Sequence, residues 1–116
     1  MKKSNYWLAG GLAALALVGA MTAAAGEVVT EAQIMAATTA AQHEEIARSY
    51  DEEATTSEKR AESHAKMAQT YRLAFSKKPG ASMANHCSRL EDDYRSAAGE
   101  YRKLAAEHRK MADAAK

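Results

Sequence analysis

The chain has 116 residues, which leaves room for one small domain. It is rich in Ala, Glu, Lys and Arg and contains a single Pro, a composition that is typical of helical proteins. Its 16 basic and 15 acidic residues nearly cancel, which argues against nucleic acid as a partner, because counterion release needs a net basic face.

The first 25 residues have the pattern of a cleavable signal peptide. Lys2 and Lys3 form a short positive region, and an uncharged run rich in Leu, Ala and Gly follows. Small residues at the end of this run place the predicted cleavage site before Gly26. We therefore expect export to the periplasm, with only transient contact with the membrane. A retained inner-membrane anchor that faces the periplasm is the alternative, because the apolar run approaches the ~20 residues that span a bilayer.

A short linker, residues 26–30, precedes the predicted helical domain, residues 31–116. Thr30 and Gln33 have the spacing of a capping box, which predicts a first helix over residues 31–75. The pair Thr38-Thr39 is a point at which the start of this helix could bend away as a separate short helix.

A turn is predicted over residues 76–81, because this segment contains Pro79 and Gly80. Ser82 is a suitable N-cap, so a second helix is predicted over residues 82–115.

Both predicted helices have a heptad pattern, in which steps of three and four residues keep one stripe facing a partner helix. In the first helix the stripe is Ile46, Tyr50, Ala54, Ser57, Ala61, His64, Ala68, Tyr71 and Phe75. In the second it is Met83, Cys87, Leu90, Tyr94, Ala97, Tyr101, Leu104, His108 and Met111. The predicted fold class is therefore all-α, a long antiparallel helical hairpin.

Folding about Pro79 places residues that are equally distant from it opposite each other. His64 then lies near Tyr94, Tyr50 near His108, and Tyr71 near Cys87. We expect His–Tyr hydrogen bonds within an Ala-rich seam, because buried polar tips need partners. The predicted structural seam residues are Tyr50, His64, Tyr71, Tyr94, Tyr101 and His108.

The seam has few large aliphatic residues, so the hairpin alone buries little apolar surface. The second helix also has a flanking stripe of small residues that would admit another helix, at Ala84, Ala98, Ala105 and Ala112. We therefore expect completion to a four-helix bundle, through a homodimer or through the N-terminal helical overhang, or docking on another helical protein.

The sequence has no Glu-x-x-His pair, Cys-x-x-Cys-His motif, His-Glu-x-x-His motif or phosphate-binding Gly-rich loop. We therefore expect no enzymatic activity and no cofactor, and a function as a periplasmic interaction or structural module. The plan is similar to that of small periplasmic helical-hairpin proteins that act in envelope stress or metal sensing. The resemblance is architectural, since the Leu-Thr-x-x-Gln motif of one such group is absent.

An alternative function is the binding of a copper ion. Three histidines, His64, His86 and His108, have a methionine one helical turn away, and a cysteine lies beside one of them; soft sulfur and imidazole suit copper. The candidate metal ligands are His64, Met67, Met83, His86 and Cys87. Methionines at this spacing also serve as core filler. For Cys87 the order of expectation is a buried thiol, then an intermolecular disulfide, then a metal ligand.

Overall fold

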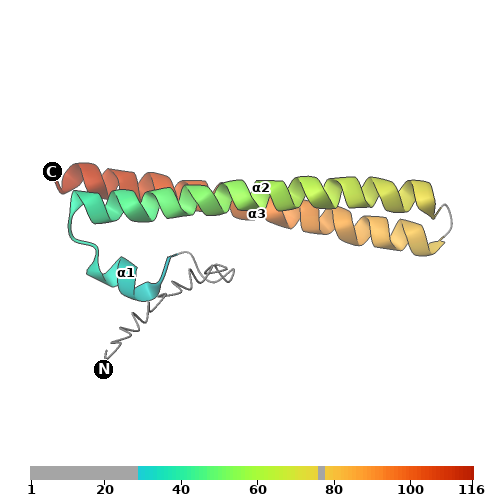
Figure 1. Ribbon diagram of the computed structural model, residues 1–116, viewed down its shortest axis with the longest axis horizontal. Coiled ribbons are helices and arrows are strands. Elements are labelled where there is room, and N and C mark those ends of the chain that lie inside the picture. The colour runs from blue at the N-terminus through green and yellow to red at the C-terminus, as the bar shows by residue number, and fades with distance from the viewer. Residues whose placement is uncertain (1–28, 76–77) are drawn as a thin grey trace, which may run out of the picture.

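The computed structural model describes residues 29–75 and 78–116, which form three helices. They are α1 (Glu31–Ala36), α2 (Ala40–Ala74) and α3 (Lys78–Ala114). Helices α2 and α3 run antiparallel and side by side (Figure 1). The predicted all-α helical hairpin is confirmed for the described part of the chain. The predicted signal peptide, residues 1–25, lies outside the described residues. None of the helices in the described segments has the length and apolar character needed to span a membrane.

The start of the domain is built from two capping boxes. The hydroxyl of Thr30 accepts a hydrogen bond from the backbone N–H of Gln33, and the Gln33 side chain accepts one from the backbone N–H of Thr30. Thr39 and Gln42 repeat the same arrangement at the start of α2. The helix predicted over residues 31–75 is therefore two helices, divided at the pair of threonines where a bend was expected.

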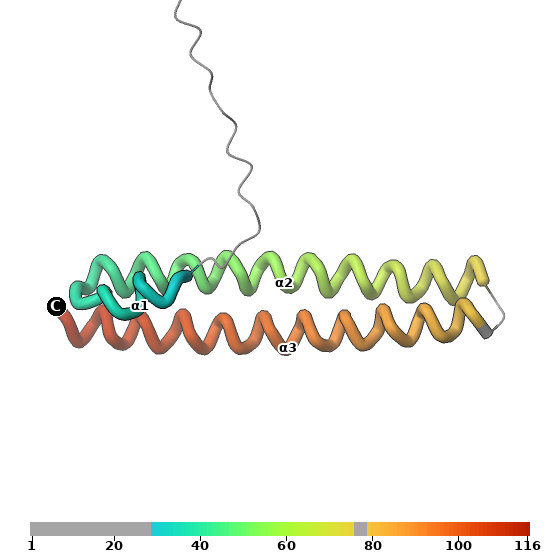
Figure 2. Tube along the Cα trace, turned by 90° about the horizontal axis from the view of Figure 1, so that it is seen from below, coloured from blue at the N-terminus to red at the C-terminus, as the bar shows by residue number. Residues whose placement is uncertain are grey.

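Helix α1 lies beside the end of the hairpin at which α2 begins and α3 ends (Figure 2). It has only six residues and none of them is buried. Its two large apolar side chains, Ile34 and Met35, are exposed. The N-terminal overhang therefore does not supply the further helical layer of a four-helix bundle.

The predicted turn is shorter than residues 76–81, because α3 begins at Lys78. Pro79 lies in the first helical turn, where the backbone N–H that it lacks would have no partner within the helix. Gly80 is buried, and a Cβ atom there would overlap the carbonyl oxygen of Phe75. The absence of a side chain at Gly80 is therefore what lets the start of α3 approach the end of α2.

The two long helices meet through columns of alanine at seven-residue spacing, which Glu91 interrupts once on α3. All of these alanines are at most 1% exposed: Ala47, Ala54, Ala61 and Ala68 on α2, and Ala84, Ala98, Ala105 and Ala112 on α3. The α3 column was expected to receive another helix, and that expectation is wrong. It is already covered by α2, because small side chains allow the closest approach of two helices.

One of the two columns of the predicted α3 seam is consequently displaced by one residue, from Met83 to Ala84 and at the heptad positions that follow, whereas the other column stays in place. Cys87 and His108 are buried in the seam as expected. The large apolar residues of the predicted seam remain between 40 and 49% exposed: Met83, Leu90, Leu104 and Met111.

Candidate functional site

The predicted copper ligands occupy different environments in the hairpin. The His64 ring stacks on Tyr94, with 5.5 Å between ring centroids. Cys87 is a free thiol buried in the seam with Ala68 and Ala84, where Tyr71 packs against it. Its neighbour His86 is exposed. The last two candidates, Met67 and Met83, are partly exposed.

Within residues 29–75 and 78–116, no three His, Cys, Asp or Glu side chains are placed to hold one metal ion. Thioether sulfurs also bind copper, so the copper hypothesis stays a prediction. Titration of the protein and of its His86→Ala, Cys87→Ala variant with Cu(I) is the measurement that tests it.

The aromatic residues of the seam pack by their faces. His64 and Tyr94 are almost coplanar, at 12°, and Tyr50 stacks on Tyr101 with centroids 6.1 Å apart. The ring centroid of Tyr50 also lies 5.8 Å from that of His108. The contacts in the described part of the chain include no His–Tyr hydrogen bond, and Nδ1 of His64 is buried there without a partner. Ring stacking thus replaces the hydrogen bonds that we expected.

Sequence reasoning missed a histidine pair near the open end of the hairpin. The Nδ1 atoms of His43 and His108 are 3.1 Å apart, a distance at which one imidazole donates a hydrogen bond and the other accepts it. Burial lowers the pKa of His108, and the positive charge that His43 can carry lowers it further. The contact therefore favours the neutral form of His108.

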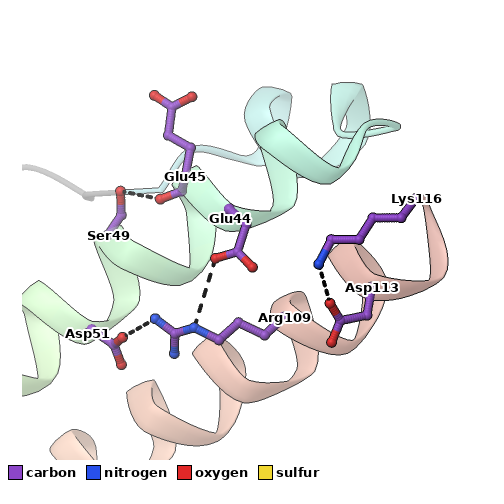
Figure 3. A network of polar contacts seen from close by, with 7 residues as sticks. All are labelled: Glu44, Glu45, Ser49, Asp51, Arg109, Asp113 and Lys116. Atoms are coloured by element: carbon purple, nitrogen blue, oxygen red, sulfur yellow. Dashed lines mark hydrogen bonds and ion pairs between the residues drawn. The ribbon is translucent and has the colours of Figure 1, made fainter.

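One edge of the hairpin carries a ladder of oppositely charged residues, here called the charged flank. Its α2 members are Glu44, Asp51, Glu58 and Arg72, and its α3 members are Ser88, Arg102 and Arg109. Both sets repeat mainly at seven-residue steps, and each interhelical contact joins one member of each set. Figure 3 shows the contact nearest the end at which α2 begins and α3 ends, in which Arg109 reaches both Asp51 and Glu44.

Further along the charged flank, Arg102 binds Glu58 with an N–O distance of 2.7 Å. The hydrogen bond from Arg102 lowers the pKa of Glu58, against the opposing effect of burial. Arg72 donates a hydrogen bond to Ser88 near the turn. The polar side chains along this edge are therefore partnered within the hairpin itself.

The opposite edge of α3 carries a column of apolar residues, here called the apolar stripe. Its five members follow each other at exact seven-residue intervals: Met83, Leu90, Ala97, Leu104 and Met111. Each precedes a position that faces α2, whereas the charged flank lies on the other side of those positions. The four large side chains of the apolar stripe are 40–49% exposed, so the hairpin covers them only in part.

A depression on the surface of α2 is lined by polar and charged side chains. Its lining residues are Arg48, Asp51, Glu52, Thr55, Thr56 and Lys59, all of them from one helix. It is open to solvent, and it contains no histidine or cysteine that could act as a nucleophile or base. The apolar stripe is therefore the stronger candidate for a functional surface.

No protein-family model, curated protein or solved structure matches this chain.

Proposed function

We propose that this chain is a small, exported, non-catalytic helical-bundle protein that serves in the periplasm as a protein-interaction or structural module. The observation that carries the proposal is the apolar stripe. A column of Leu and Met at strict heptad spacing that is about half exposed along a rigid helix is the arrangement that packs against a further helix.

The asymmetry of the hairpin supports the same function. On the charged flank, side chains of α2 and α3 satisfy one another across the seam. On the stripe side, α3 presents large apolar groups that α2 leaves half uncovered. Because apolar surface gains free energy when it leaves water, the stripe side is the edge at which a partner would add stability. The partner is a second copy of the chain or another helical protein.

Site-specific photo-crosslinking tests this function. A photo-reactive residue replaces Leu90 in the apolar stripe, or Leu73, a leucine of α2 that is 77% exposed and lies outside the stripe. Both variants are expressed as the full chain and irradiated in cells. We expect a discrete adduct from position 90 and none from position 73. The adduct should disappear when Leu104→Glu is added, and the protein recovered from the periplasmic fraction should begin at Gly26.

Equal labelling from positions 90 and 73, or an adduct that survives Leu104→Glu, would show that the stripe is not a docking surface. Recovery of the uncleaved chain in the membrane fraction would favour the anchored alternative for its location.

A further inference from the structure

The order of residues along the apolar stripe has a symmetry that the rest of α3 lacks. Read from either end, its side chains run Met, Leu, Ala, Leu, Met, all at seven-residue spacing. The exposed fractions repeat this symmetry: 47% and 49% for the outer methionines, and 40% and 42% for the leucines. The smallest member, Ala97, lies at the centre.

This arrangement fits a partner helix that runs antiparallel and has the same sequence. If two copies of α3 cross at Ala97, Leu90 of each copy lies opposite Leu104 of the other, and Met83 lies opposite Met111. Large side chains then meet large ones of matching exposure, and the small residue at the centre allows the helices to approach most closely. A two-fold axis requires this self-complementarity, in which residue i contacts residue j and j contacts i.

We infer that the occupant of the apolar stripe is a second copy of this chain, packed antiparallel on α3 with the two-fold axis at Ala97. The inference rests on the proposed function and adds the partner, the orientation and the register. Two hairpins joined in this way form a four-helix bundle in which the charged flanks stay on the outside.

Disulfide trapping tests the register directly. The full chain is expressed and purified in a Cys87→Ala background, so that each variant carries a single introduced thiol. Cβ atoms must come within ~3.5–4.5 Å to form a disulfide, which only residues at or across the axis achieve. Light scattering of the parent protein should give the mass of a dimer. Under mild oxidation, Ala97→Cys should link to its own copy.

The leucine positions give the matched controls. Leu90→Cys alone and Leu104→Cys alone should stay unlinked, whereas a mixture of the two proteins should form the mixed disulfide. Leu73→Cys, which is more exposed than either, should stay unlinked in every mixture. If Cys87→Ala reduces the helical content, the same series is run with Cys87 retained, and the parent protein supplies the background.

Three results would overturn the inference: a monomer at all concentrations, a Leu90→Cys protein that links to itself as in a parallel pair, or a dimer without the mixed disulfide. A monomer that still gives the stripe-dependent photo-adduct with another protein would leave the proposed function standing. A monomer without that adduct would remove both.

Discussion

His108 is a buried polar residue in the seam of the hairpin. It is buried, its Nδ1 atom lies 3.1 Å from that of His43, and Tyr50 packs against its ring. A hydrogen bond between two imidazoles requires at least one neutral ring, and a second proton would place two positive charges in contact. The pair is thus compatible with the fold only while at least one of its rings is neutral.

The free energy of unfolding should therefore depend on pH. The pKa of His108 is lowered in the folded chain from about 6.5, so between that value and the folded value the unfolded chain binds the additional proton. The contribution of His108 to the free energy of unfolding is fully present above about pH 6.5. It decreases as the pH falls toward the pKa of His108 in the folded chain. We expect chemical denaturation at about pH 8 and pH 5 to show this decrease.

The substitution His108→Gln should weaken that pH dependence, because the titrating ring is removed. The exposed His86 provides the control, and His86→Gln should leave the dependence unchanged. The same slope in all three proteins would assign the effect to other groups. The range from about pH 5 to about pH 8 lies above the one in which Glu58 titrates, because Arg102 lowers the pKa of that carboxyl group.

The contacts between individual residues show where the sequence predicts correctly which residues of α2 and α3 lie opposite each other. Counting outward from Pro79 placed His64 against Tyr94, and the structure brings these rings together. The same count placed His108 opposite Tyr50 alone. In a heptad seam each residue lies between two residues of the facing helix, one heptad apart, so His108 also contacts His43. Counting outward from Pro79 assigns one partner to each residue, so it cannot supply the second contact.

At the scale of the helices, the alanine columns decide the packing. An alanine side chain lets two helix axes come close, and a larger residue at the same place would force them apart. We expect Ala105→Leu to lower the free energy of unfolding by ~1–3 kcal/mol through overpacking.

The adjacent alanine is a matched control for this prediction. Ala106 is exposed on the same helix, so Ala106→Leu should change stability little. Urea denaturation followed by circular dichroism measures both. Equal effects of the two substitutions would mean that α3 does not face α2 through the Ala105 column.

Two glycines of α3 should respond in opposite directions to substitution by alanine. A Cβ atom at Gly80 overlaps the backbone of Phe75, so Gly80→Ala should lower stability by ~1–3 kcal/mol. A Cβ atom at Gly99 meets nothing within 4 Å, so Gly99→Ala should raise stability by ~0.5–1 kcal/mol, because Ala is the better helix former. Thermal denaturation of the two variants checks the signs. Stabilisation by both would show that the approach at Gly80 is not tight.

The helix phase is the part of the fold that the heptad pattern left ambiguous. Steps of three and four fit α3 in two neighbouring phases, one with Met83 and Leu90 inside and one with Ala84 and Ala98 inside. Hydrophobicity alone favours the first, but close approach of two backbones selects the second. Local chemistry was more decisive elsewhere, since a capping box and a pair of threonines fix the ends of α1 and the start of α2.

At the scale of the whole molecule, the two edges of the hairpin differ in chemical character. The charged flank sets acidic residues of α2 against basic residues of α3, which favours the antiparallel register and disfavours any pairing of like helices on that side. A search for charges four apart within one helix does not reveal this ladder. Its signal is the seven-residue recurrence of Glu44, Asp51 and Glu58 against Arg102 and Arg109.

The apolar stripe lies beside the alanine column of α3, and that column faces α2. The sequence analysis placed a surface for a further helix on these alanines, but they are buried against α2. The surface that we propose lies one residue earlier in each heptad, at Leu104 instead of Ala105 and at Ala97 instead of Ala98. The chemical character of the surface changes with that shift, from a tight contact between backbones to one between large flexible side chains.

The hairpin also sets a distance. Helix α2 has 35 residues and α3 has 37, so at about 1.5 Å per residue each extends for ~50–55 Å. Helix α2 begins and α3 ends at one end of the hairpin, and the opposite end presents the exposed side chains of Leu73 and Phe75. A partner bound at the tip formed by Leu73 and Phe75 would lie ~50 Å from the end at which α2 begins and α3 ends.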